Sequence, residues 1–208
     1  MDRLKELETE LQQLMKGGFA SADAYQRFEE VRVECRQLAF DQKVAAGDFG
    51  GALCLCDSQE VAGTIIRLAP LMSDEVLRDT LRYEWPRCEA HRPYRAELVC
   101  LFRRVGFVCD SEADPNFADR VTVYRGNLGE KEPVGISWTL DRERAKWFST
   151  WSQSPRAAFL GIDTRGIPTV WQGVVDRNGI LGYFTGRGEE EVVLDPQAIQ
   201  DVRRLSAF

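Results

Sequence analysis

Three short segments in the second half of the chain carry side chains that could bind and activate a polar ligand. A strand-like run ends at Tyr124-Arg125-Gly126, residues 135–139 carry two hydroxyl groups, and the acidic residues 189–191 lead into Val-Val-Leu. The Arg125 guanidinium is a planar, permanently charged fork that suits a phosphate group. Gly126 beside it would let a ligand approach the backbone closely.

The two hydroxyl groups belong to Ser137 and Thr139. Side chains alternate along a strand, so these two share one face. They precede a predicted helix, where they could orient a polar ligand or simply cap the helix. This segment alone does not decide between the two roles.

Glu189 and Glu191 form the acidic part of the pattern. On an extended β segment they would point the same way, with Cα atoms about 6.5 Å apart. Glu191 precedes an apolar run, so we expect it to be the more buried of the two. A run of three glutamates is more commonly a solvated face, and two carboxylates this close repel each other unless a cation lies nearby.

Taken in order, these segments resemble the ADP-ribosyltransferases of the Arg-Ser-Glu class, and most closely the compact bacterial or phage toxins and effectors of that class. The family carries an arginine on a strand, a Ser-x-Ser/Thr strand before a helix, and a Glu-x-Glu that enters a strand. In the family, the helix after the serine strand carries an alanine and an aromatic residue, which correspond here to Ala145 and to Trp147-Phe148. The match runs over residues 121–196, about a third of the chain.

The resemblance implies a mixed β-sandwich that holds NAD+ in a cleft, with no metal. Arg125 would hold the phosphates and the nearby ribose, and Ser137 would orient the catalytic glutamate. Glu191 would bind the 2′-hydroxyl of the nicotinamide ribose. Glu189 would orient or deprotonate the acceptor, a role the family often links to arginine acceptors. Further cofactor contacts would come from Gly126, Thr139, Trp147 and Phe148.

The resemblance implies transfer of ADP-ribose from NAD+ to a macromolecular acceptor, with release of nicotinamide. Elementary chemistry agrees with that activity. Breaking the bond between nicotinamide and ribose gives an oxocarbenium-like sugar, which a nearby carboxylate stabilises. Nicotinamide leaves as a neutral molecule, so no general acid is needed. The only histidine of the chain, His91, is therefore no obstacle, and a His-rich metal site is excluded.

The elements that must position these residues differ between the two halves of the chain. Residues 1–115 predict helices at 4–14, 22–46, 52–68, 76–85 and 94–105, with Ser21 and Ser73 at helix starts and Gly106 at a helix end. The first helix carries an apolar stripe of Leu4, Leu7, Leu11 and Leu14. The second is expected to bury a face made of Tyr25, Phe28, Val31, Cys35 and Leu38.

Residues 116–208 predict strands at 121–124, 169–175, 180–184 and 192–194. A helix at 141–148, capped by Thr139, interrupts them. Asp176-Arg177-Asn178-Gly179 predicts a hairpin with a primed turn. The fold class is thus α+β, with an N-terminal helical region for target recognition or packing on a C-terminal β-sandwich. Only twelve residues separate Arg125 from Ser137, so the covering helices must come from the first half, and the halves could form one intertwined domain.

Composition limits the partners. The 208 residues carry a net charge of −6, which favours a protein acceptor over a nucleic acid. A local basic patch keeps a nucleic-acid acceptor open; it consists of Arg142, Arg144, Lys146 and Arg156. We expect no membrane partner, reduced cysteines, and a protein that acts in a cytoplasm or is delivered into that of a host. A toxin of this kind would need a neutralising partner protein or a delivery route.

Three other functions fit parts of the pattern. An NAD+ glycohydrolase would use water as the acceptor. A glycoside hydrolase would use Glu189 and Glu191 as its acid pair, but both would approach a sugar from one side. A non-catalytic interaction protein would use the leucine stripe to dock a partner helix and keep the β region as a degenerate scaffold.

Overall fold

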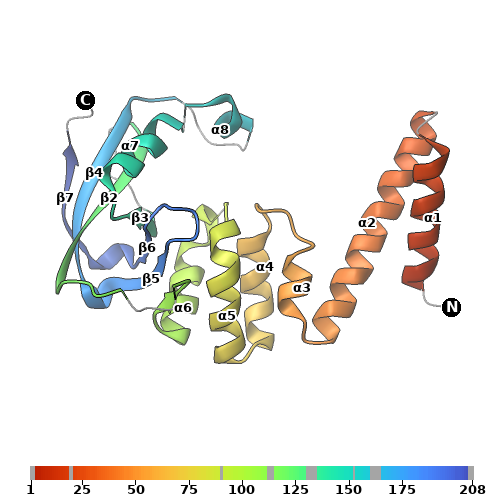
Figure 1. Ribbon diagram of the computed structural model, residues 1–208, viewed down its shortest axis with the longest axis horizontal. Helices are drawn as coiled ribbons and strands as arrows, with labels where there is room; N and C mark the ends of the chain where they lie inside the picture. The colour runs from red at the N-terminus through yellow and green to blue at the C-terminus, as the bar shows by residue number, and fades with distance from the viewer. Residues whose placement is uncertain are drawn as a thin grey trace.

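The computed structural model describes residues 3–18, 21–89, 91–111, 115–129, 135–151, 153–159 and 165–205, except for the side chains of residues 156 and 159. Within them the chain forms a series of helices followed by a seven-stranded mixed sheet (Figure 1). The predicted α+β class is therefore confirmed.

The helical region contains six α-helices: α1 (Arg3–Gly17), α2 (Ala22–Ala45), α3 (Phe49–Leu53), α4 (Val61–Leu68), α5 (Asp74–Glu84) and α6 (Arg95–Val105). The predicted starts are confirmed, since Ser21 accepts a hydrogen bond from the amide of Ala24 and Ser73 accepts one from Val76. The single helix predicted over 52–68 is wrong. A turn between Asp57 and Glu60 separates α3 from α4. The amide of Glu60 donates a hydrogen bond to the carbonyl of Asp57, and the amide of Asp57 donates one to the Glu60 carboxylate.

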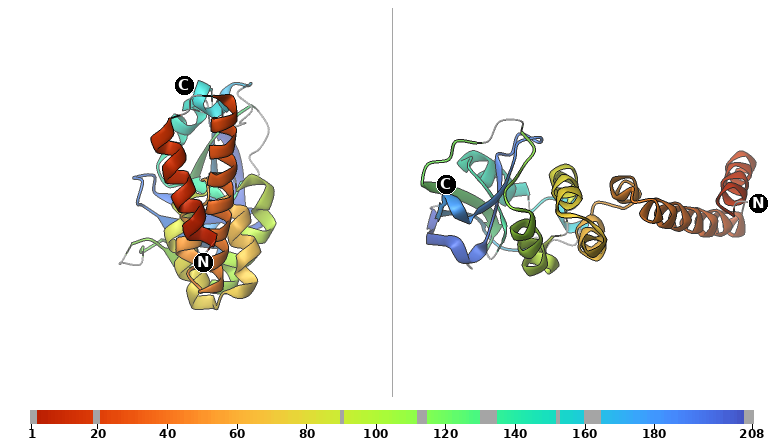
Figure 2. Two further views of the ribbon diagram at one scale, coloured as in Figure 1. Left: turned by 90° about the vertical axis from the view of Figure 1, so that its right-hand side faces the viewer. Right: turned by 90° about the horizontal axis from the view of Figure 1, so that it is seen from below.

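Helices α1 and α2 form an antiparallel pair that extends away from the rest of the molecule (Figures 1 and 2). Leu7 and Val31 are fully buried. The predicted buried face of α2 is only partly right, because Tyr25 is 53% exposed. This pair buries a narrow seam, so a residue at the edge of the stripe remains in solvent.

The sheet contains β1 (Val108–Cys109), β2 (Arg120–Leu128), β3 (Ser137–Thr139), β4 (Pro168–Asp176), β5 (Ile180–Phe184), β6 (Glu191–Leu194) and β7 (Ile199–Leu205), in the order β1-β5-β6-β3-β2-β4-β7. Among the described strands, only β1 and β5 pair in parallel. Strands β1 and β7 and the short helix α8 (Pro155–Phe159) were not expected from the sequence. Strand β1 precedes residue 115, so the sheet begins inside the predicted helical half.

One registered pair, Tyr124 with Thr139, joins β3 to β2. Within the described residues the sheet therefore has two parts, β1-β5-β6-β3 and β2-β4-β7, which this one pair connects. Both parts contribute side chains to one core, made of Val123, Trp138, Trp171, Val175, Ile180, Val192 and Leu194. The resemblance implied a mixed β-sandwich, whereas the described strands are hydrogen-bonded as one mixed sheet.

The predicted hairpin at 176–179 is wrong. Strand β4 pairs with β2 and β7, while β5 pairs with β1 and β6, so the two strands are not partners. Their connection, Arg177–Gly179, is a 3-10 turn that carries the chain from one part of the sheet to the other. Backbone bonds from Arg177 to Asp119 and from Asp195 to Gly179 fix it to neighbouring segments.

The helical region packs on β1, β5 and β6. A second core contains Phe102 of α6 together with Leu181, Phe184 and Val193 of the sheet. Arg103 of α6 also pairs with the buried carboxylate of Asp195. These contacts place the segment after α5 opposite the interior strands β3 and β6, which carry Ser137 and Glu191.

Candidate functional site

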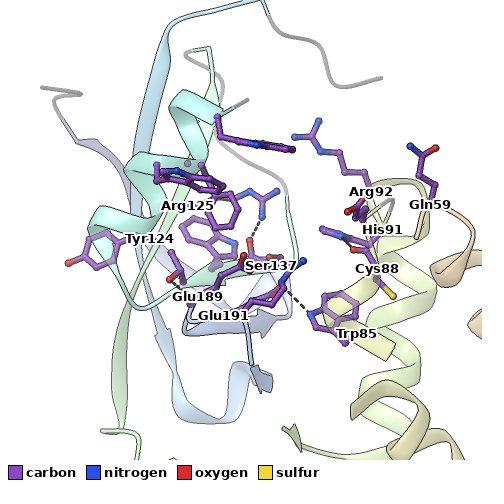
Figure 3. Close-up of a pocket in the computed structure, with 18 of the residues that line it drawn as sticks. Gln59, Trp85, Cys88, His91, Arg92, Tyr124, Arg125, Ser137, Glu189 and Glu191 are labelled. Atoms are coloured by element: carbon purple, nitrogen blue, oxygen red, sulfur yellow. Dashed lines mark hydrogen bonds and ion pairs between the residues drawn. The ribbon is translucent and has the colours of Figure 1, made fainter. Parts of the chain in front are cut away.

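A hollow of about 690 Å³ lies between the helical region and the sheet. Figure 3 shows Arg125, Ser137, Glu189 and Glu191 on the sheet side, facing Trp85 and His91 on the helical side. All eight residues expected in the site line this hollow: Arg125, Gly126, Ser137, Thr139, Trp147, Phe148, Glu189 and Glu191.

Glu191 begins β6 opposite Thr139 of β3 and is 8% exposed. The indole Nε1 of Trp85 donates a hydrogen bond to its Oε1 at 3.1 Å. Burial raises the pKa of Glu191, while hydrogen bonds from the side chains of Ser137 and Trp85 oppose that rise. The carboxylate is thus held in place by two donors from opposite sides of the hollow.

The Arg125 guanidinium lies deep in the wall and donates a hydrogen bond to the carbonyl oxygen of Ser137. Burial and the charge of Arg92 lower its pKa to about 10, against the opposing effect of Glu191. An added Cβ at Gly135 would lie 2.4 Å from Arg125 Cζ. Glycine at 135 therefore leaves the space that this guanidinium occupies.

Thr139 acts on the backbone around it. Its hydroxyl donates to the carbonyl of Glu189 at 2.6 Å and accepts from the amide of Asp141 at 3.1 Å. The prediction that Thr139 caps the following helix, α7 (Arg142–Trp151), is wrong. Asp141 takes that role, because its carboxylate accepts from the amide of Glu143 at 2.7 Å.

The prediction that Glu189 and Glu191 lie on one extended segment is wrong. Glu190 has a φ of 44°, in the left-handed region. Its carbonyl accepts from the amide of Leu140 at 3.1 Å, which holds the turn against β3. Glu189 instead pairs with Arg187, at 2.9 Å between Oε2 and Nη2. Arg187 is therefore the cation that an acid pair needs, and the sequence analysis did not assign it.

Gly126 also has a structural reason to be glycine, besides the predicted approach of a ligand. A Cβ there would lie 2.0 Å from the carbonyl oxygen of Ala145 and 2.6 Å from the amide nitrogen of Ser149. Both atoms belong to α7, so Gly126 allows this helix to pack on β2. Close approach of a ligand to Gly126 from this side is excluded by α7.

Helix α7 forms one rim of the hollow with aromatic side chains. Trp147 is 47% exposed and stacks on Trp151, with ring centroids 6.1 Å apart. Phe148 meets Trp147 edge to face at 5.1 Å, and the Arg144 guanidinium lies 5.6 Å from the Trp147 centroid. The rim offers a flat surface to a planar group. Arg156 of the predicted basic patch has its side chain outside the described residues.

The opposite wall was missed by the sequence analysis. It includes Trp85, Cys88, His91 and Arg92. Burial lowers the pKa of His91 to about 4 and raises that of the Cys88 thiol to about 12, so the imidazole is neutral and the thiol is no nucleophile at neutral pH. Trp85 is the one tryptophan of the first half and His91 the one histidine of the chain, but composition does not reveal that they face Glu191.

Among the described residues, no group of three or more His, Cys, Asp or Glu side chains is placed to hold a metal ion. Within the same residues, no helix is both long and apolar enough to cross a membrane.

Comparison with known proteins assigns the chain to no family. No family model matches it, and neither a curated protein nor a solved structure matches it. Any function must therefore be argued from the residues around the hollow.

Proposed function

We propose that the protein is an NAD+-dependent mono-ADP-ribosyltransferase that moves ADP-ribose from NAD+ to a macromolecular acceptor and releases nicotinamide. One observation carries the proposal: a guanidinium, a hydroxyl and a buried carboxylate, from Arg125, Ser137 and Glu191, meet around one hollow. A protein acceptor is favoured, through an arginine side chain, with a nucleic acid as the alternative.

The side chains around the hollow fit a dinucleotide. Its volume of about 690 Å³ lies within the range of small-molecule sites, about 300–1,000 Å³. Arg125, with Arg92 on the facing wall, supplies positive charge for a diphosphate. The exposed ring of Trp147 offers a surface on which a planar base could stack.

Glu191 would act on the ribose. Trp85 holds one carboxylate oxygen, and the carboxylate keeps lone pairs to accept the 2′-hydroxyl of the nicotinamide ribose. As the bond to nicotinamide breaks, its electron pair leaves with the neutral ring, and the sugar becomes cationic beside the carboxylate. A well-placed group of this kind contributes about 3–4 kcal/mol to the transition state. Only the ionised carboxylate can do this, so the hydrogen bonds from Ser137 and Trp85 favour the reaction.

The test uses NAD+ labelled in its adenylate phosphate, a cell lysate, and separate protease and nuclease digestion of the products. We expect protease-sensitive label and free nicotinamide. Glu191→Gln should lower turnover by about 10²–10³-fold, while Glu190→Gln, a change of the exposed neighbouring carboxylate, should retain it. No labelled macromolecule together with no free nicotinamide would refute the proposal.

A second candidate is an NAD+ glycohydrolase. The ion pair between Glu189 and Arg187 favours it, because a carboxylate that is held by a cation is a weaker base for an acceptor. Glu189→Ala separates the two candidates. A transferase should lose the transfer of label while it still consumes NAD+, whereas a glycohydrolase should transfer no label in either form.

A further inference from the structure

His91 presents a buried nitrogen without a partner. Its Nδ1 lies 3.2 Å from the carbonyl oxygen of Cys88, and a carbonyl can only accept a hydrogen bond. Nδ1 therefore carries the proton, and Nε2 carries a lone pair. Among the described residues, Nε2 is buried and has no hydrogen-bond partner. A buried acceptor that receives no hydrogen bond destabilises a fold, so an unpaired Nε2 at this position needs an explanation.

The position of His91 supplies one. The ring lines the hollow on the helical side (Figure 3), and its centroid is 5.5 Å from that of Trp85. Trp85 in turn bonds to the Glu191 carboxylate. Glu191 and the imidazole therefore line the same hollow, with Trp85 in contact with both, so one bound molecule can reach both.

The charges that face His91 keep the ring neutral. Burial lowers its pKa, and so do the Arg125 guanidinium across the hollow and Arg92 and Arg95 on its own side. The bond to the Cys88 carbonyl opposes them, and together these effects bring the pKa to about 4. At neutral pH the ring cannot donate from Nε2. It can only accept.

We propose that His91 Nε2 accepts a hydrogen bond from an N–H or O–H group of the molecule bound in the hollow, and so makes the helical region part of the site that selects the substrate. The naming of that molecule rests on the proposed function. The donor belongs either to NAD+, as a carboxamide or ribose hydroxyl, or to the incoming acceptor, as a guanidinium.

The chain has one histidine, so one imidazole can be observed without assignment. The full-length protein is labelled with ¹⁵N-histidine, and long-range ¹H–¹⁵N spectra are recorded at pH 7 during titration with three probes. These are NAD+, ADP-ribose, and agmatine as a guanidinium. We expect a proton on Nδ1 in the free protein and an upfield shift of Nε2 on binding.

The probes identify the donor. A shift with NAD+ but not with ADP-ribose points to the carboxamide, a shift with both points to the ADP-ribose part, and a shift with agmatine alone points to the acceptor. If Nε2 is unmoved by all three, or if it carries the proton in the free protein, the inference is wrong.

Two variants give a second readout, in which affinity for the probe that moves Nε2 is measured by titration calorimetry. His91→Phe keeps a flat ring without an acceptor, and should weaken binding about tenfold to a hundredfold. His91→Gln places an amide oxygen near the position of Nε2, and should stay within about threefold of the parent. Equal affinities of the two variants contradict the inference.

The outcomes separate this inference from the proposed function. NAD+ that shifts Nε2, together with a lysate assay that gives neither labelled macromolecule nor free nicotinamide, would support the role of His91 and overturn the transferase. NAD+ that is consumed at a Glu191-dependent site while Nε2 stays unmoved by all three probes would do the reverse.

Discussion

The packing of α7 on β2 at Gly126 makes a sharp prediction for Gly126→Ala. The new Cβ would lie 2.0 Å from the carbonyl oxygen of Ala145 and 2.6 Å from the amide nitrogen of Ser149. Both are backbone atoms, so no change of side-chain rotamer relieves the contact. An ordinary contact of about 3.5 Å requires α7 to retreat by about 1.5 Å.

The expected cost is large for a single methyl group. Overpacking destabilises a protein by about 1–3 kcal/mol, and a clash with a helix backbone belongs at the upper end, about 3 kcal/mol. For a chain of this size the melting temperature falls by about 2–4 °C per kcal/mol, which gives a decrease of about 6–12 °C. The retreat would also widen the hollow, because α7 carries Trp147 and Trp151 on its rim.

Thermal unfolding followed by circular dichroism measures the effect. The matched control is Gly50→Ala in α3, where a new Cβ meets no atom within 4 Å. Alanine in a helix is more favourable than glycine by about 0.5–1 kcal/mol, so the control should melt at the same temperature or slightly higher. If Gly126→Ala melts together with Gly50→Ala, α7 is not packed on β2 as described.

Three further predictions concern stability. Folding raises the pKa of Glu191 above its ordinary 4.5, so ionisation of this carboxyl destabilises the fold as the pH rises through the pKa of the folded state. Glu191→Gln should therefore resist urea better than the parent at pH 7 but not at pH 4. An equal difference in urea resistance at both pH values would contradict the raised pKa. Folding lowers the pKa of His91 from 6.5 to about 4. The unfolding free energy of the parent should therefore fall by about 3 kcal/mol as the pH decreases from 6.5 to 4. Urea titration should show this decrease in the parent and not in His91→Gln. Because Glu190 has a φ of 44°, Glu190→Gly should raise the unfolding free energy by about 1 kcal/mol and Glu190→Val should lower it; a less stable glycine variant would count against the left-handed turn.

Features that depend on near neighbours were predictable from the sequence. Ser21 and Ser73 cap helices because the amide they bind is three residues away. Gly106 ends α6 with a φ of 80°, which favours glycine. The order of the three segments was also enough to predict that Arg125, Ser137 and Glu191 would lie together, and all three line one hollow.

Features that depend on distant partners were not predictable. Trp85 and Glu191 are 106 residues apart, and their contact exists only because α5 and α6 pack on the sheet. Asn-Gly in the predicted hairpin marks a turn, yet it does not specify which strands pair. The glutamate run is not extended because Thr139 and Leu140, some fifty residues earlier, hold its backbone.

The core that joins α6 to β5 and β6 has a consequence for dissecting the protein. A polypeptide that begins at residue 116 would leave Leu181, Phe184 and Val193 without their cover and the Asp195 carboxylate without Arg103. Such a fragment should aggregate or bind the missing piece when the two are mixed. A chimaera that keeps the fold would therefore have to carry both halves together.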